Sequence, residues 1–163
     1  MKQLFCIAIG LLCALGTSQD SVKEVLGTYN DHSVEYIYGD QLAKLTPAPL
    51  LLDTREKEEY DISHLKDAIH VGFRKVNISK IGKLTHDKNT TIVVYCSIGV
   101  RSERIGKQLI AEGYTAVYNL YGGIFEWVNN GKKVYNNNKE TPKVHAYSEK
   151  WGAYLIKGTK VYD

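Results

Sequence analysis

A short apolar run, Thr91–Tyr95, followed by a cysteine and a helical pattern, constrains the fold of this chain more than any other stretch. The run is almost entirely β-branched and aromatic, which is typical of a strand buried on both faces of a parallel sheet. From about Arg101 the spacing is helical, and Gly113 is placed to end the helix. One face of that helix carries three apolar residues, Ile105, Leu109 and Ile110. The sequence therefore predicts a strand–loop–helix unit with Cys96 at the junction.

The position of Cys96 favours its thiolate form. A thiol between a strand and a helix faces unpaired backbone N–H groups and the positive end of the helix dipole. Both stabilise the anion, so a thiol that is mostly protonated in water can ionise at neutral pH. We therefore expect Cys96 to be a catalytic nucleophile. The alternative for a lone cysteine is a buried and inert core position.

The loop after Cys96 suits a small anion. Gly99 permits a tight turn in which successive amides point inward, and Arg101 adds a planar fork of donors that matches oxyanions. Two reactions fit such a site: transfer of a sulfane sulfur from an anion such as thiosulfate, and hydrolysis of a phosphomonoester. Protein tyrosine phosphatases place an arginine six positions after the cysteine, whereas Arg101 lies five positions after Cys96. The shorter loop favours sulfur transfer over a cysteine phosphatase or an arsenate-reductase-like enzyme.

The first residues of the chain have the layout of a secretory signal peptide. One lysine precedes an apolar run, Leu4–Leu15, and Ala14 and Gly16 occupy the −3 and −1 positions of a cleavage before Thr17. The run is shorter than the roughly 20 residues of a membrane span, so no stable membrane span is expected. We predict a signal peptide over residues 1–16 and an exported protein, periplasmic or secreted. The alternative is a buried N-terminal helix.

Cysteine usage and charge narrow the function further. Of the three cysteines, Cys6 and Cys13 lie in the predicted signal peptide, which leaves Cys96 as the single thiol of the mature chain. A lone cysteine with scattered histidines has no metal-ligand spacing, so neither a metal site nor a cofactor is expected. The formal charge of +3 is mild and the basic residues are scattered. Nucleic acid is therefore not an expected partner.

Strands alternate with helical segments through the middle of the chain. Besides the run before Cys96, three short apolar runs predict strands, Leu50–Asp53, Ile69–Val71 and Thr115–Leu120. The segments between them are polar or have helical spacing, and Gly122 and Gly123 precede an amphipathic turn. This alternation predicts an α/β fold with a mostly parallel central sheet flanked by helices.

The composition divides the mature chain into three parts. Residues 17–32 are polar and are interpreted as an N-terminal tether or a frayed helix. Residues 33–130 form the predicted domain, and the asparagine-rich stretch 129–139 is interpreted as a linker. Residues 131–163 form a C-terminal extension. Its aromatic residues predict that it packs on the domain; they include Tyr147, Trp151 and Tyr154.

Four segments, in their order and spacing, resemble the single-domain rhodanese family. They are Leu51–Glu56 with Glu59 and Tyr60, His64–Val71, Val94–Ser102 and Leu120–Trp127. The resemblance covers the chain from about Ser33 to Trp127 and implies a rhodanese-like fold and a thiosulfate-type sulfurtransferase. In that family the loop cysteine attacks the outer sulfur of thiosulfate, sulfite leaves, and a cysteine persulfide remains. A thiophilic acceptor, cyanide or another thiol, then takes the sulfur.

The resemblance implies a role for each motif residue. Cys96 would carry the persulfide, and Arg101 would hold the sulfonate end of a small anionic sulfur donor. Asp53 and Arg55 would brace the loop as a buried ion pair. His64 is interpreted as a structural hydrogen-bonding residue. The backbone amides of the loop would stabilise negative charge and bind substrate; they belong to Ser97, Ile98, Gly99, Val100, Arg101 and Ser102.

The chain departs from the family pattern at several positions. Ser63 and Asp67 replace glycines of the second motif, and Gly72 stands where a proline is common. Ser97 occupies a loop position that is often basic, which leaves Arg101 as the only cation of the loop. This difference favours a donor other than thiosulfate. A non-catalytic rhodanese-like binding module is therefore kept as an alternative function.

Overall fold

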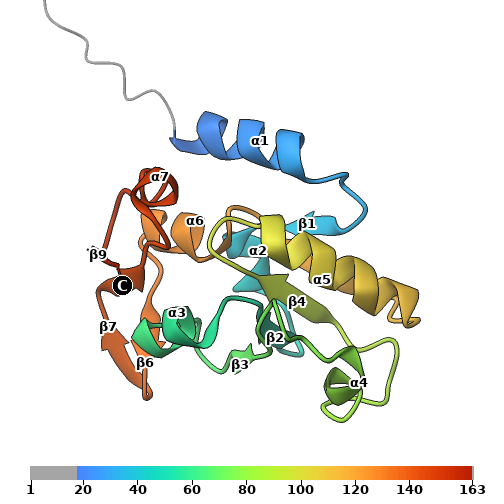
Figure 1. The fold of residues 1–163 in the computed structure, drawn as a ribbon. Helices are drawn as coiled ribbons and strands as arrows, with labels where there is room; N and C mark the ends of the chain where they lie inside the picture. The colour runs from blue at the N-terminus through green and yellow to red at the C-terminus, as the bar shows by residue number, and fades with distance from the viewer. Residues whose placement is uncertain (1–17, 163) are drawn as a thin grey trace, which may run out of the picture.

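The computed structural model describes residues 18–162 of the 163-residue chain (Figure 1). The predicted signal peptide, with Cys6 and Cys13, lies outside the described residues. None of the helices formed by residues 18–162 is long and apolar enough to cross a membrane.

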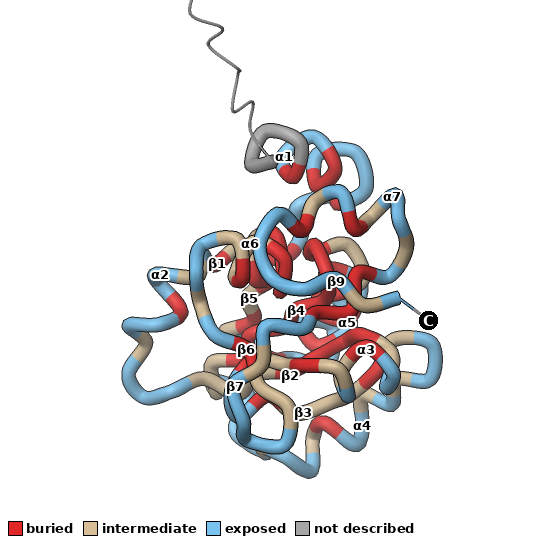
Figure 2. Tube along the Cα trace, turned by 90° about the vertical axis from the view of Figure 1, so that its left-hand side faces the viewer, coloured by how far each residue is buried: buried red, intermediate tan, exposed pale blue. Residues whose placement is uncertain are grey.

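The core of the molecule is a five-stranded, fully parallel sheet, so the predicted α/β fold is confirmed. The strand order is β1-β5-β4-β2-β3. The strands are β1 (Glu35–Ile37), β2 (Leu50–Asp53), β3 (Ile69–His70), β4 (Ile92–Tyr95) and β5 (Val117–Leu120). β1 was not predicted. Strand β4 is central, and all four of its residues are buried, as the apolar run before Cys96 predicted (Figure 2).

Helices cover both faces of the sheet. They are α2 (Gly39–Leu42), α3 (Lys57–Ile62), α4 (Ile78–Ile81), α5 (Val100–Ala111) and α6 (Gly123–Asn129). Val93 and Tyr95 of β4 pack with α2 and α6, whereas Ile92 and Val94 pack with α4 and α5. Alternate residues of one strand thus serve two core clusters, which is why the sequence of β4 is continuously apolar.

Helix α5 follows its sequence prediction with one correction. Ile105 and Leu109 are buried, and Gly113 after the helix has a φ of +91°, as a glycine stop requires. Ile110 was expected on the same face but is 41% exposed. It lies next to Leu109 on a helix, so the 100° step between neighbours turns its side chain toward solvent.

The segment interpreted as a tether forms a helix, α1 (Ser18–Tyr29). Its apolar residues Val22, Val25 and Leu26 are buried and pack with Ile98 of the loop that follows β4. The interpretation as a tether was therefore wrong, and that as a frayed helix underestimated the packing. The three apolar residues recur at i, i+3 and i+4, and this short stripe was missed among polar neighbours.

The asparagine-rich stretch is a β-hairpin rather than a linker. Strands β6 (Val134–Asn136) and β7 (Lys139–Thr141) pair antiparallel around Asn137 and Asn138, whose φ angles are +46° and +62°. A two-residue hairpin loop of type I′ needs positive φ at both positions, and asparagine tolerates that conformation better than most residues. The asparagines were therefore a turn signal.

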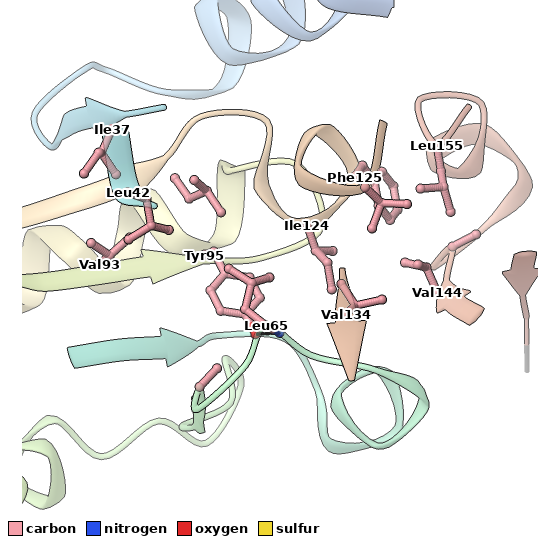
Figure 3. Packing of buried hydrophobic residues seen from close by; sticks show 14 residues of the cluster. Ile37, Leu42, Leu65, Val93, Tyr95, Ile124, Phe125, Val134, Val144 and Leu155 are labelled. Carbon is pink, nitrogen blue, oxygen red and sulfur yellow. Dashed lines mark hydrogen bonds between the residues drawn. The ribbon is translucent and has the colours of Figure 1, made fainter. Parts of the chain in front are cut away.

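The rest of the C-terminal extension packs on the sheet. It contains β8 (Lys143–His145), α7 (Glu149–Gly152) and β9 (Thr159–Val161), and β8 pairs parallel with β9. Val134, Val144 and Leu155 are buried in the cluster that contains Phe125 of α6 (Figure 3). The extension is therefore part of the core of the domain.

Two departures from the family pattern have a backbone explanation. Asp67 has a φ of +60° and Gly72 a φ of +75°. A glycine is the usual residue at the first position because it reaches this region without strain, and aspartate is one of the few other residues that do so readily. The carboxylate of Asp67 thus stands at a turn with a positive φ.

Candidate active site

Cys96 lies where sequence analysis placed it, between the end of β4 and the start of α5. The side chain is almost fully buried, with 1% of its surface exposed. Gly99 precedes α5 with a φ of +111°, a conformation that side-chain-bearing residues rarely adopt. This left-handed residue turns the loop sharply enough to bring its backbone around the sulfur.

The surroundings of Cys96 favour its ionised form. The Gly99 N–H lies 3.1 Å from the Cys96 sulfur, and the Ser102 hydroxyl lies 3.6 Å from it. Burial alone raises the pKa of the Cys96 thiol, but the positive charge of Arg101 and the hydrogen bonds from Ser102 and Gly99 outweigh burial. The pKa therefore lies below its usual value, as a nucleophilic thiolate requires.

The carbonyl group of Gly99 is fixed by two asparagine side chains. Asn119 at the end of β5 donates to it at 2.8 Å, and Asn30 after α1 donates at 3.0 Å. The Ser102 hydroxyl lies 2.8 Å from the Asn119 Oδ1 and 3.6 Å from the Cys96 sulfur, and these two acceptors share its one proton. These contacts hold the Gly99 carbonyl while the Gly99 N–H lies 3.1 Å from the sulfur.

The N-terminus of α6 holds the other side of the loop. The N–H of Ile124 donates to the Cys96 carbonyl at 2.9 Å, and the N–H of Phe125 donates to the Ser97 carbonyl at 3.1 Å. A Cβ atom at Gly123 would lie 2.3 Å from the Cys96 carbonyl oxygen. Only glycine permits this approach, so the Gly122–Gly123 break has a direct role in placing Cys96.

Arg101 does not point freely into solvent. Its two terminal nitrogens donate to both Glu59 oxygens, at 2.6 and 2.7 Å, and one also donates to the Ser97 hydroxyl at 2.9 Å. The Glu59 carboxylate also accepts from the Glu56 N–H at the start of α3. Burial raises the pKa of Glu59, but the contact with Arg101 lowers it more, so Glu59 is ionised and partly neutralises Arg101.

Behind this pair lies a second, fully buried ion pair. Arg55 donates to both Asp53 oxygens, with a shortest distance of 2.6 Å, and neither side chain is exposed. Arg55 also donates to the Ser63 carbonyl at 2.6 Å, which ties the segment after α3 to β2. The positive charge of Arg55 helps to lower the pKa of Glu59. The buried charges therefore alternate in sign from Asp53 to the Cys96 thiolate.

A small pocket of about 130 Å³ opens above the Cys96 sulfur. Its inner side is formed by five loop residues, Cys96, Ser97, Ile98, Val100 and Arg101. Its outer side is formed by Tyr147 and Trp151 of the C-terminal extension. The Tyr147 ring lies 4.9 Å from the centre of the Arg101 guanidinium, a cation–π distance. Figure 1 shows α7, which contains Trp151, beside α1.

The sequence therefore predicted the loop but not everything that surrounds it. His64 stacks on Tyr60, with ring centroids 4.1 Å apart, and pairs its backbone with Tyr135 rather than facing the pocket. From the sequence, Glu59 was noted only as part of a motif that resembles the rhodanese family, and Asn119 only as one residue of a predicted strand. The buried polar residue in an apolar strand was the available signal for Asn119. Tyr147 and Trp151 carried no signal beyond being aromatic.

Within residues 18–162, no group of three or more histidine, cysteine, aspartate or glutamate side chains is arranged to hold a metal ion. The chemistry available at the pocket is that of a buried thiolate beside an arginine.

Comparison with known proteins agrees with this geometry. Residues 39–130 match the family model described as Rhodanese-like domain. Over 103 residues the chain is 33% identical to tRNA uridine(34) hydroxylase of Yersinia pestis, a match that covers 60% of this chain and 29% of the hydroxylase. The chain thus spans less than a third of the length of that curated relative.

Two solved structures share the fold. Thiosulfate sulfurtransferase from Pseudomonas aeruginosa superposes with a TM-score of 0.60 at 19% identity, over 85% of this chain and 26% of that one. The polysulfide-sulfur transferase homodimer from Wolinella succinogenes superposes with a TM-score of 0.55 at 22% identity, over 72% of this chain and 86% of that one. At these identities the likeness concerns the fold alone.

Proposed function

The chain belongs to the rhodanese-like domain family, and we propose that it is a sulfurtransferase that works through a Cys96 persulfide. The donor is thiosulfate or a similar small anion, and the acceptor is a thiophile, cyanide or a thiol. The observation that carries the proposal is the buried Cys96 sulfur, 3.1 Å from the Gly99 N–H at the start of α5 and open to a small pocket. The matched hydroxylase is not a guide to substrate, because this chain covers only a fraction of it.

In the first step the Cys96 thiolate attacks the outer sulfur of the donor. A bond forms between the two sulfurs, the sulfur–sulfur bond of thiosulfate breaks, and its electron pair leaves with sulfite. The product is a persulfide anion on Cys96. The Gly99 N–H and the Ser102 hydroxyl, which stabilise the thiolate, are placed to stabilise negative charge at the same position.

Arg101 is the group that would hold the anionic end of the donor. A guanidinium has five N–H donors. Three hydrogen bonds within the described residues use N–H groups of Arg101, two to Glu59 and one to Ser97. The remaining N–H groups are available to donor oxygens. The Glu59 carboxylate weakens the net positive charge, so a dianionic donor gains less here than at an unpaired arginine.

In the second step the acceptor attacks the outer sulfur of the persulfide. The Cys96–sulfur bond breaks, and its electron pair returns to Cys96 as a thiolate. The low pKa of Cys96 makes this thiolate a good leaving group, since a thiol of lower pKa leaves faster. The same surroundings therefore assist both halves of the reaction.

Intact mass spectrometry of the protein after incubation with thiosulfate tests this proposal. The expected result is a gain of one sulfur that cyanide removes, and that the Cys96→Ser variant does not show. If Cys96 is free and alkylatable but takes no sulfur from thiosulfate or from polysulfide, the protein is a binding module instead. Phosphatase turnover with p-nitrophenyl phosphate well above that of Cys96→Ser would instead favour a cysteine phosphatase.

We further propose that the protein is exported, to a periplasm or to the exterior. The support is the apolar segment Leu4–Leu15 with small residues before Thr17. N-terminal sequencing of the protein from its native source should begin at Thr17. A native chain that still begins at Met1 would contradict the proposal.

A further inference from the structure

Two aromatic side chains on the outer side of the pocket have no role in the chemistry proposed above. Tyr147 lies between β8 and α7, and Trp151 lies in α7. Both come from the C-terminal extension, beyond residues 39–130 that match the family model. A pocket that served a small inorganic anion alone would need polar groups at this position.

The two aromatic residues are held in place. Tyr147 has a φ of +66°, and its N–H donates to the His145 Nδ1 at 3.1 Å. A bulky residue keeps such a strained conformation only where its surroundings enforce it. The Ser148 hydroxyl accepts from the Trp151 N–H at 3.4 Å, and the Trp151 ring meets Tyr29 of α1 edge-on at 6.1 Å. The outer wall of the pocket, formed by Tyr147 and Trp151, is therefore preformed.

The size and lining of the pocket suit an organic group. The volume is about 130 Å³, close to the cavity of about 150 Å³ that accepts benzene in another protein. Ile98 and Val100 line the pocket together with the two aromatic residues. A ring or a short aliphatic chain attached to a sulfur atom at Cys96 would therefore contact aliphatic and aromatic side chains.

The charges near the pocket disfavour a second anion. Glu59 partly neutralises Arg101, and the loaded Cys96 carries a negative persulfide. An adjoining cavity that also includes Tyr147 is lined by Glu56, Glu58 and Arg74. An acceptor that carried a carboxylate would meet a surplus of negative charge, whereas an uncharged one would not.

We propose that Tyr147 and Trp151 form an acceptor subsite for a small uncharged organic thiol. This inference rests on the proposed function, because the thiol takes its sulfur from the Cys96 persulfide. The acceptor enters as the uncharged thiol. Its sulfur attacks the outer sulfur and its proton passes to that outer sulfur, a new sulfur–sulfur bond forms on the acceptor, and the Cys96–sulfur bond breaks with its electron pair returning to Cys96. The products are an organic persulfide and the Cys96 thiolate, and no oxidant or reductant is consumed.

Discharge of the loaded protein by matched thiols tests the subsite. The protein is loaded with thiosulfate, or with polysulfide if thiosulfate fails, and freed of donor. Loss of the sulfur is then followed by intact mass with benzyl mercaptan, 2-mercaptoethanol and mercaptoacetate. Benzyl mercaptan should discharge the protein about tenfold faster than 2-mercaptoethanol at equal thiol concentration, and mercaptoacetate should be slowest.

Two variants show whether the outer wall causes this preference. Tyr147→Ala and, separately, Trp151→Leu should each reduce the ratio of benzyl mercaptan to 2-mercaptoethanol several-fold. Tyr38→Ala is the matched control, because Tyr38 is similarly exposed (49% against 44%) but does not line the pocket, and it should keep the ratio. Rates that follow only the acidity of the thiols, or a ratio that survives both pocket variants, would overturn the proposal.

A second measurement separates this proposal from the proposed function. Unloaded Cys96 is alkylated with N-ethylmaleimide and with N-phenylmaleimide, and the ratio of rates is compared with that for free cysteine. The subsite predicts a ratio shifted toward the aromatic reagent in the wild type and in Tyr38→Ala, but not in Tyr147→Ala. If no donor loads the protein, the proposed function fails while this ratio still decides the subsite. A ratio equal to that of free cysteine would refute the subsite.

Discussion

The two sides of the pocket differ in origin and in support. The inner wall, Cys96–Ser102, is one continuous stretch whose polar groups are fixed by α6, Asn119 and two ion pairs. The outer wall, Tyr147 and Trp151, is brought to the pocket only by folding of the C-terminal extension, and Tyr147 is 44% exposed. The comparison indicates that the reactive group is encoded locally, whereas the shape of the space around it depends on distant sequence.

Removing one charge behind the inner wall should have the largest effect. Asp53→Asn leaves Arg55 without its buried partner, and breaking a buried ion pair costs about 3–5 kcal/mol. The free energy of unfolding, measured by urea denaturation, should fall by that amount. Asp61→Asn is the matched control, because its pair with Lys57 is exposed and worth at most about 1 kcal/mol. Equal losses in the two variants would mean that the buried pair does not support the inner wall.

Disturbing the contact between α6 and the inner wall should have the second largest effect on stability. Gly123→Ala places a Cβ 2.3 Å from the Cys96 carbonyl oxygen and puts alanine at a φ of +56°. We expect a loss of about 2–4 kcal/mol in urea denaturation and slower loading of Cys96. Gly131→Ala has the same kind of φ, +77°, but nothing within 4 Å of its Cβ. Its loss should be about 1 kcal/mol, with normal loading. Normal loading by Gly123→Ala would show that the approach of α6 does not position Cys96.

Removing one hydrogen bond within the inner wall should have a smaller effect. Ser102→Ala should raise the pKa of Cys96, because the hydroxyl 3.6 Å from the sulfur is lost. The rate of alkylation by iodoacetamide as a function of pH measures this pKa. Ser79→Ala, which removes an exposed hydroxyl bonded to Asn77, should leave it unchanged.

The lowered pKa of Cys96 also makes the free energy of unfolding depend on pH. The pKa of Cys96 is lower in the folded than in the unfolded protein, so its ionisation stabilises the fold above the unfolded value of about 8.5. This contribution is lost as the pH falls through the folded-state pKa. Between the two values, stability should rise with pH more steeply in the wild type than in Ser102→Ala. Identical slopes would show that the Ser102 hydroxyl does not lower the pKa of Cys96.

Removing the outer wall should disturb stability least. Tyr147→Ala deletes a partly exposed ring whose contact with Arg101 is worth about 0.5–1 kcal/mol. Urea denaturation should show a loss of about 1 kcal/mol or less, and the pKa of Cys96 should shift little because Glu59 still holds Arg101. A loss above about 2 kcal/mol would show that the outer wall supports the fold as well as the pocket.

The same division explains what could be predicted from sequence. The strand before Cys96, the turn at Gly99 and the helix after it depend on neighbouring residues, and the structure has all three. Periodicity and turn chemistry are sufficient for features of this kind. The pair of Asp53 and Arg55 was expected only from the resemblance to the rhodanese family, and the structure has it.

The rest depended on contacts between distant segments. The pairing of Arg101 with Glu59 joins α5 to α3 and could not be deduced from either segment alone. The docking of α1 rests on three buried side chains within a polar sequence, too few for a clear pattern. The position of Tyr147 follows from the pairing of β8 with β9, three-residue strands whose composition carries little signal.

If Cys96 carries sulfur as proposed, its isolation sets the kinetic form of that reaction. It is the only cysteine between residues 18 and 162, and it lies at the bottom of a pocket rather than beside a second thiol. Sulfur carried there cannot be relayed to a neighbouring cysteine of that part of the chain, so donor and acceptor must visit the same cavity in turn. Turnover by this route is a ping-pong cycle, and double-reciprocal plots at several acceptor concentrations should give parallel lines.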